Sequence, residues 1–124
     1  MESIQNNKQA AVHFLELIIA RKIDEAFNTY VNRNGVHHNP YYPAGFPALQ
    51  KGMKDNDAQI PHKQMIVKNV IGEGDLVAVH FHLILQPYEM AVVHLFRFED
   101  QKIVELWDLG MPIPADNPNK DGVF

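Results

Sequence analysis

The stretch that decides the fold runs from Val77 to Asp108 and reads "VAVHFHLILQPYEMAVVHLFRFEDQKIVELWD". It is rich in β-branched and aromatic residues, and two short polar segments, "QPYE" and "EDQK", divide it into three strands. Connections this short join antiparallel neighbours. A similar apolar segment, "MIVKNVI" at 65–71, precedes the turn "GEGD" and adds a fourth strand. We therefore predict a four-stranded antiparallel meander over residues 65–109.

The chain before the meander is predicted to be helical. Apolar residues recur at helical spacing over residues 11–18 and 23–31, and a weaker helix is predicted over 47–60. The second helix is expected to stop at "NRNG", where Asn34 and Gly35 suit a positive φ. The proline-rich "VHHNPYYPAG" that follows is predicted as a loop with room for a short strand. Helices followed by strands indicate an α+β domain whose helices cover one face of the sheet.

Length and composition indicate one domain over residues 1–124. A chain of 124 residues is long enough to bury one core and too short for two. With a net charge of −4 it offers nucleic acid no basic surface, and the lack of cysteine excludes disulfides and thiolate chemistry. The apolar run "FLELIIA" contains Glu16 and follows no basic segment, so it resembles neither a signal peptide nor a membrane span. We expect a cytoplasmic protein without membrane contact.

Three histidines interrupt the apolar strands. His80 and His82 share one face of their strand, opposite a wholly apolar face, and His94 lies on the next strand. A three-residue turn at 87–89 would set His82 opposite His94, whereas a two-residue turn at 87–88 would place them on opposite faces of the sheet. The turn lacks a diagnostic glycine, so the sequence leaves both registers open.

Asp108 is the acid that the same pattern singles out. A three-residue turn at 99–101 would pair His94 with Leu106 and leave Asp108 diagonal to His94, within side-chain reach. A carboxylate in an otherwise apolar strand needs partners or a function. We predict that His80, His94 and Asp108 point into one pocket, and that Trp107 packs on the opposite, outer face.

A metal site is the first alternative for the histidines. His-x-His on one strand with a third histidine on its neighbour is one way to bind zinc. Such a site also needs residues that orient each imidazole and an open coordination position, and neither can be proposed from the sequence. We therefore predict no metal and no cofactor. The other alternative places His80 and His82 as partly exposed side chains at a dimer face.

Three segments carry a resemblance to a known family. They are "VHHNP" (36–40), "VVHLFRFEDQKIVELWD" (92–108) and "NPNKDGVF" (117–124). Together with the helix pattern they resemble the SnoaL-like polyketide cyclase group of the nuclear transport factor two superfamily. The resemblance implies a cone-shaped α+β barrel, with N-terminal helices on a curved antiparallel sheet, and one small-molecule pocket between them. Relatives include cofactor-free cyclases, ketosteroid isomerase and binding proteins, so the fold does not fix the activity.

Two positions depart from the family pattern. His94 stands where these relatives commonly carry an acid, and Leu106 stands where they carry the histidine of His-Trp-Asp. The matching interior face would also carry Phe96 and Asp108. Since an acid and a histidine are replaced by a histidine and a leucine, a family mechanism does not transfer directly.

The first functional hypothesis is a cofactor-independent isomerase or cyclase that moves a proton next to a carbonyl. Asp108 would be the base, with its pKa raised by the apolar pocket. His94, with His80 or His38, would donate a hydrogen bond to the enolate oxygen. The predicted substrate-binding residues are His38, Tyr30, Tyr42, His82, Phe96 and Leu106.

The second hypothesis is a binding protein with the same pocket and no chemistry, which the two departures favour. In either case we expect a small hydrophobic carbonyl compound as the ligand. The family resemblance and the apolar outer residues further predict a homodimer that pairs through the outer sheet face.

Overall fold

Five strands form one mixed sheet in the computed structural model, which describes residues 2–124. The sheet order is β1-β5-β4-β3-β2, and β2 to β5 form the predicted antiparallel meander. The strands are β1 (Val31–His37), β2 (Gln64–Glu73), β3 (Leu76–Ile84), β4 (Glu89–Glu99) and β5 (Lys102–Pro112). The predicted α+β class is confirmed, while the sheet stays open and gains a parallel edge strand, β1, beside β5.

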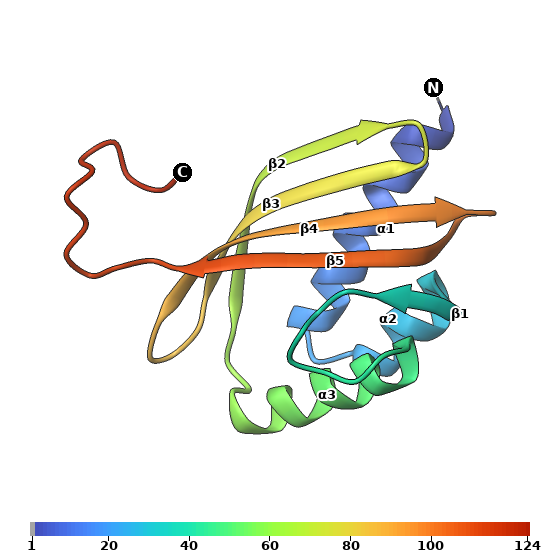
Figure 1. Cartoon of the computed structure of the whole chain (residues 1–124), viewed down its shortest axis with the longest axis horizontal. Helices are drawn as coiled ribbons and strands as arrows, with labels where there is room; N and C mark the ends of the chain where they lie inside the picture. The colour runs from blue at the N-terminus through green and yellow to red at the C-terminus, as the bar shows by residue number, and fades with distance from the viewer. Residues whose placement is uncertain (1) are drawn as a thin grey trace.

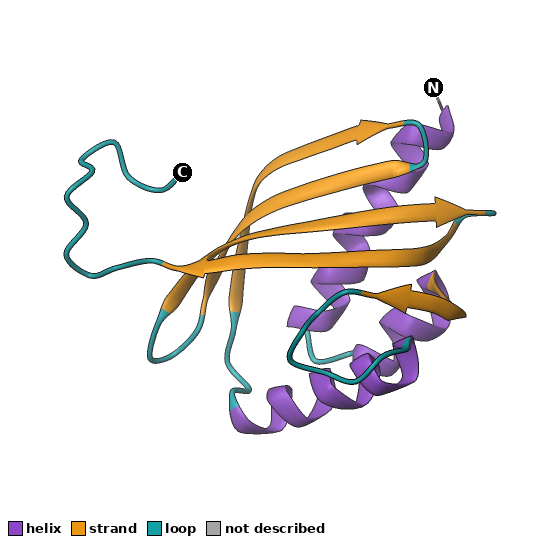
Figure 2. Ribbon diagram, viewed as in Figure 1, coloured by secondary structure: helices purple, strands orange, loops and turns teal. Residues whose placement is uncertain are grey.

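Three helices cover the concave face of the sheet (Figures 1 and 2). They are α1 (Glu2–Ile19), α2 (Ile23–Tyr30) and α3 (Phe46–Gln59). The bounds of α2 and α3 lie within one residue of the predicted ranges, whereas α1 begins nine residues before the predicted start. Edge-to-face aromatic contacts stabilise this packing. The ring of Phe14 in α1 lies 5.5 Å from that of Phe27 in α2, and 6.0 Å from that of Phe96 in β4, which joins the two layers. In the part of the chain that the structure describes, no helix is long and apolar enough to span a membrane.

Gly35 has a different role from the one predicted. The chain passes from α2 straight into β1, and neither Asn34 nor Gly35 has a positive φ. A Cβ atom on Gly35 would lie 2.3 Å from the carbonyl oxygen of Val104 and 2.7 Å from the ring of Phe46. Glycine is therefore required by the close approach of β1 to β5, and the predicted turn at "NRNG" is wrong.

The β4–β5 hairpin sets the register of the functional face. Its turn has two residues, Asp100 and Gln101, both with positive φ (49° and 66°). The ladder then shifts by one residue, because β5 bulges at Val104. As a result His94 lies directly opposite Asp108, on the predicted face but two residues further along than the predicted pairing with Leu106.

Candidate active site

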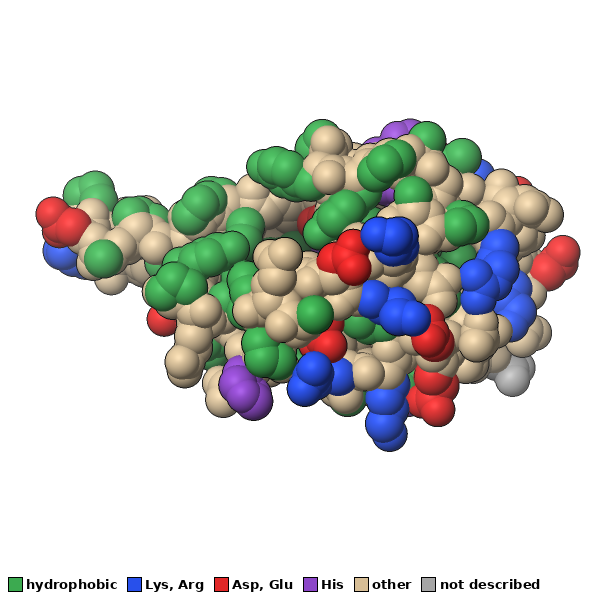
Figure 3. Space-filling model, turned by 90° about the horizontal axis from the view of Figure 1, so that it is seen from below, with side chains coloured by type: hydrophobic (Ala, Val, Ile, Leu, Met, Phe, Trp, Pro, Cys, Tyr) green, Lys and Arg blue, Asp and Glu red, His purple; other side chains and the backbone are tan. Residues whose placement is uncertain are grey.

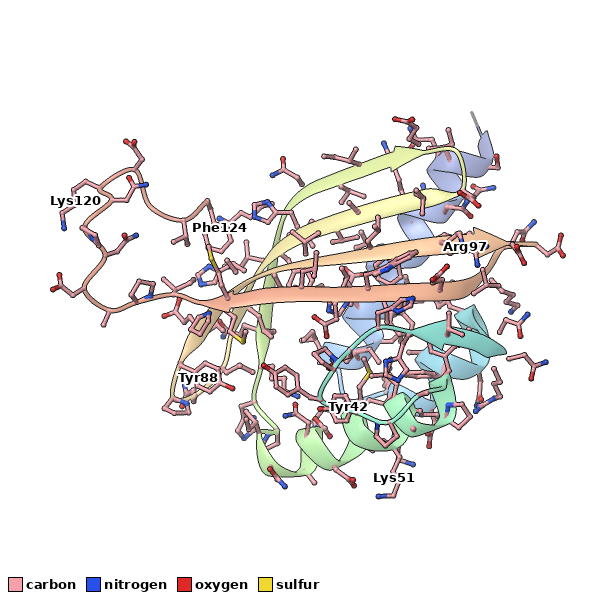
Figure 4. The ribbon with its side chains drawn as sticks, viewed as in Figure 1. Tyr42, Lys51, Tyr88, Arg97, Lys120 and Phe124 are labelled. Carbon is pink, nitrogen blue, oxygen red and sulfur yellow. The ribbon has the colours of Figure 1, made fainter. Side chains whose placement is uncertain are left out.

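A cavity of about 510 Å³ lies between the helices and the inner face of the sheet. This volume is in the range of small-molecule sites. Tyr41 and Tyr88 line the cavity and are exposed, so they mark where it opens to solvent. Figure 4 shows Tyr88 at the end of the β3–β4 hairpin and Tyr42 beside α3. The wall is mostly apolar and includes Leu15, Ile18, Met53, Met65, Phe81, Leu83, Met90 and Val92.

A polar cluster of Asn39, His94 and Asp108 interrupts this apolar wall. His94 Nε2 lies 3.0 Å from Asp108 Oδ1, and Asn39 Nδ2 donates to Asp108 Oδ2 at 2.8 Å. The His94 side chain is 9% exposed and that of Asp108 is 27% exposed. The predicted juxtaposition of His94 and Asp108 on one face is confirmed, and the partly exposed Asp108 and Asn39 are the members that a ligand can reach.

Asn39 is held in place by a second buried histidine. His37 Nδ1 accepts the backbone N–H of Asn39 at 3.1 Å, and its Nε2 donates to the carbonyl of Pro43 at 2.7 Å. Asn39 Oδ1 in turn accepts the backbone N–H of Tyr41. The sequence "VHHNP" contained this signal, but the prediction gave the pocket role to His38 and missed both His37 and Asn39.

The pKa of Asp108 is lowered, contrary to the predicted rise. Burial alone raises the pKa of this carboxyl. The charge of His94 and the hydrogen bonds from His94 and Asn39 favour the ionised form, and together they outweigh burial. Asp108 is therefore a fixed carboxylate at neutral pH.

Because the pKa of Asp108 is lowered in the folded chain, the stability of the fold depends on pH. A carboxyl whose pKa is lower in the folded than in the unfolded chain stabilises the fold above the unfolded pKa, about 3.9, and loses that contribution as pH falls through the folded pKa. We expect the stability advantage of the wild type over Asp108→Asn to shrink between pH 6 and pH 3. Urea unfolding at both pH values measures it, and a constant difference would contradict the ion pair.

His94 acts on Asp108 and not on a ligand. Its Nε2 is used by Asp108, and its Nδ1 is buried without a hydrogen-bond partner among the described residues. The ring edge packs against Phe81, with centroids 5.3 Å apart. The predicted donation from His94 to a ligand oxygen therefore lacks an accessible nitrogen, because Nε2 is paired with Asp108 and Nδ1 is buried.

Tyr42 is better placed than His94 to donate a hydrogen bond to a ligand oxygen. It lines the cavity, and its ring lies over α3 at Gly52, where a Cβ atom would come within 2.3 Å of the ring. Burial, with the nearby charge of Asp108, raises the pKa of Tyr42, so the hydroxyl keeps its proton. Its predicted place in the pocket agrees with the structure.

A comparison with known protein families assigns the chain to one of them. The model of the SnoaL-like domain matches residues 11–106 of the chain. The chain belongs to the SnoaL-like domain family. No functionally curated protein matches this SnoaL-like chain.

Solved structures share the fold of the SnoaL-like chain at low identity. AclR, a candidate hydroxylase from Streptomyces galilaeus, is 19% identical, with a TM-score of 0.76 over 87% of this chain and 90% of its own. IdmH, a candidate polyketide cyclase from Streptomyces antibioticus, is 17% identical, with a TM-score of 0.72 over 84% and 91%. An M. tuberculosis epoxide hydrolase of the LEH-like type is 15% identical, with a TM-score of 0.72 over 88% and 85%. These similarities support the fold and no particular reaction.

His80 and His82 lie on the outer face of the SnoaL-like sheet, so their predicted place in the pocket is wrong. The β3–β4 ladder pairs Val79 with His94, which turns the two histidines away from the cavity. Asn69 contacts His80 Nδ1 at 3.0 Å, and the ring of Phe124 packs over both histidines. The apolar face of β3, predicted to be a dimer surface, faces inward instead. His80 and His82 therefore point away from His94, so the three imidazoles cannot bind one metal ion together.

His38 also lies outside the cavity. It stacks on Trp107, with centroids 5.2 Å apart, and its Nε2 lies 2.7 Å from Glu105 Oε2. These contacts place His38 on the outer face together with Trp107, whose outer position was predicted correctly.

Three further predicted binding residues lie away from the cavity. Tyr30 pairs its hydroxyl with His13 at the end of α2. Phe96 and Leu106 face each other across β4 and β5 on the predicted inner face, but both are fully buried in the core. Phe96 and Leu106 therefore pack in the core below the polar cluster and do not line the cavity.

Proposed function

We propose that this SnoaL-like domain is a cofactor-independent enzyme that moves a proton next to the carbonyl of a small hydrophobic compound. The products would be those of an isomerisation or an intramolecular aldol cyclisation. One observation carries the proposal: a partly exposed carboxylate, Asp108, is fixed between His94 and Asn39 in an otherwise apolar cavity. A few convergent polar groups in an apolar pocket are typical of small-molecule sites.

Asp108 would act as the base. Each of its oxygens accepts one hydrogen bond, and an ionised carboxylate has further lone pairs for a ligand proton. Asp108 would take a proton from the carbon beside the carbonyl, and the electron pair of that bond would move to the carbonyl oxygen to give an enolate. Isomerisation returns the proton from Asp108 to another carbon. Cyclisation forms a carbon–carbon bond to a second carbonyl, whose oxygen then takes the proton back from Asp108 to give a hydroxyl group.

The enolate oxygen would be stabilised by neutral donors. Tyr42 keeps its hydroxyl proton, and Asn39 has a second amide N–H besides the one given to Asp108. Donors that are fixed before the reaction stabilise the charge as it develops. His94 would stay beside Asp108 as a positioning residue.

A binding protein without chemistry is the second candidate. It is favoured by the lowered pKa of Asp108, which makes the carboxylate a weaker base. A base is most effective when its pKa lies near the working pH. In this candidate the polar cluster would only orient a bound carbonyl compound.

Hydrogen–deuterium exchange separates the two candidates. A panel of enolisable ketones is incubated with the protein in D₂O, and exchange at the carbon beside the carbonyl is followed by NMR. The enzyme is expected to accelerate exchange for at least one ketone that binds. Binding of these ketones without acceleration above buffer would refute the enzyme and support the binding protein.

We also propose a homodimer that pairs through the outer face. This face exposes apolar side chains of β2 and β5: Ile66, Ile71, Leu109 and Met111. Figure 3 views the molecule from below, where α3 lies in Figure 1, and shows hydrophobic side chains toward the end that bears the C-terminal tail; it does not look onto the outer face of the sheet. Exposed apolar patches of this kind commonly mark interfaces.

Leu109→Glu is expected to weaken this dimer at least tenfold. Leu109 is 61% exposed on the outer face of β5, and twofold symmetry would place two new charges in one apolar interface. Sedimentation across micromolar concentrations measures the dissociation constant, with Ala58→Glu on the exposed side of α3 as the matched control. A wild-type protein that sediments as a monomer throughout would contradict the dimer.

A further inference from the structure

A positively charged side chain, that of Lys63, lies at the end of the cavity opposite the polar cluster. Lys63, which directly precedes β2, lines the cavity together with Asn56 of α3. Its Nζ donates to Asn56 Oδ1 at 2.6 Å. Since the amide oxygen of Asn56 faces Lys63, its N–H₂ group is available to donate elsewhere.

The charge of Lys63 is not neutralised by a neighbour. The nearest acid that acts on it, Asp57, is held by Arg21, whose Nε lies 3.2 Å and 3.0 Å from the two carboxylate oxygens. Among the described residues, no carboxylate lies within ion-pair distance of Lys63. Lys63 is half-buried, and this burial lowers its pKa. A half-buried cation without a counter-ion is costly in an apolar setting, and a bound anion would offset that cost.

The two ends of the cavity are far apart. Met65, two residues beyond Lys63, belongs to the inner row that also contains Leu83, Met90 and Pro112. Pro112 is four residues from Asp108 on β5, so this row and the polar cluster are separated by roughly 13 Å along the strands. Apolar side chains line the space between them, which suits an elongated hydrophobic ligand.

We propose that Lys63 and Asn56 form a carboxylate-binding subsite, so that the substrate is an elongated hydrophobic carboxylic acid whose enolisable carbonyl lies at Asp108. The inference rests on the proposed function of the same cavity, and it adds the substrate class. Lys63 would pair with one carboxylate oxygen, and the free N–H₂ of Asn56 would donate to the other. A single ammonium group matches a singly charged acid.

Binding of a matched pair of probes tests the subsite. Octanoate and 1-octanol share the same chain and differ in charge, and their affinities at pH 7 are measured by titration calorimetry. We expect octanoate to bind about tenfold more tightly, as one charge-assisted hydrogen bond provides. Equal affinities would overturn the proposal.

Substitutions at position 63 test whether Lys63 causes the preference for octanoate over 1-octanol. Lys63→Met removes the charge at similar volume and is expected to abolish the preference for octanoate, whereas Lys63→Arg retains it. Lys54→Met on the exposed side of α3 is the matched control and should leave the preference unchanged. If Lys63→Met does not fold, Lys63→Gln is used in its place. A preference that persists without the charge at position 63 would refute the subsite.

The pH dependence gives a second readout. The preference should fall as pH rises, because the ammonium group of Lys63 loses its proton, and at a lower pH than for an exposed lysine. A preference that stays constant from pH 6 through the pKa of an exposed lysine, about 10.4, would count against Lys63.

The subsite and the proposed reaction fail separately. Preference for octanoate without ketone exchange would support the subsite and refute the enzyme. Ketone exchange without any preference for octanoate would support the enzyme and refute the subsite.

Discussion

Asp108→Asn is expected to slow ketone exchange by about 10²- to 10⁴-fold, the contribution typical of a general base. The amide has the same shape as the carboxylate but cannot take a proton from carbon. The change also converts one of the two acceptors into a donor, which must face either the amide of Asn39 or the imidazole of His94. We therefore expect a loss of stability of about 1 to 3 kcal/mol, as for an unsatisfied buried group.

Controls separate the loss of the base from the loss of the fold. Asp116→Asn in the exposed tail changes the same chemical group far from the cavity and should leave exchange unchanged. Circular dichroism and octanoate affinity are measured for both variants, since Asp108 does not belong to the proposed carboxylate subsite. Exchange by Asp108→Asn at the wild-type rate would show that another group is the base.

Gly35→Ala is expected to destabilise the fold by about 3 kcal/mol. The new methyl group would lie 2.3 Å from the carbonyl oxygen of Val104 and 2.7 Å from the ring of Phe46. The first atom is backbone and the second belongs to a fully buried side chain, so neither can move without disturbing the core. Forcing extra atoms into a packed site typically costs 1–3 kcal/mol, and a clash with backbone lies at the upper end of that range.

Gly110→Ala is the matched control for this clash. Gly110 is also a strand glycine, but the nearest atom to its added methyl group is the terminal methyl of Met90 at 3.2 Å, which can rotate away. Its cost should stay below about 1 kcal/mol. Urea unfolding of both variants gives the comparison, and equal stabilities would show that β1 can move away from β5.

The strands of the meander could be predicted, whereas for β1 only a short strand within the loop after the second helix was expected. Residues 65–109 are rich in β-branched and aromatic residues and are divided by short polar turns, and this pattern alone defines the four strands. β1 reads "VNRNGVH", with only its ends buried, so it carries no such pattern. It is a strand because β5 offers a free edge and because Gly35 lets the two backbones approach closely.

The predicted face of each site residue depended on the register of a hairpin. His94 and Asp108 were placed on one face because the predicted and observed registers of the β4–β5 hairpin differ by two residues, which preserves the face. The face of His80 depended on the turn "QPYE", in which a change of one residue exchanges the two faces. The pKa of Asp108 was mispredicted because only burial was considered. The charge and hydrogen bond of His94, and then the hydrogen bond of Asn39, 69 residues away in the chain, act in the opposite direction and outweigh burial.

The methionines of the cavity wall give evolution positions at which the range of ligands can change. Three of the five in the chain, Met53, Met65 and Met90, line the cavity, and none belongs to the polar cluster. Methionine is unbranched and adapts its shape at low cost. Selection can therefore reshape the ligand range at these positions while the reactive group stays unchanged. A library randomised at the three methionines should yield variants that accept bulkier or more branched ketones and still depend on Asp108.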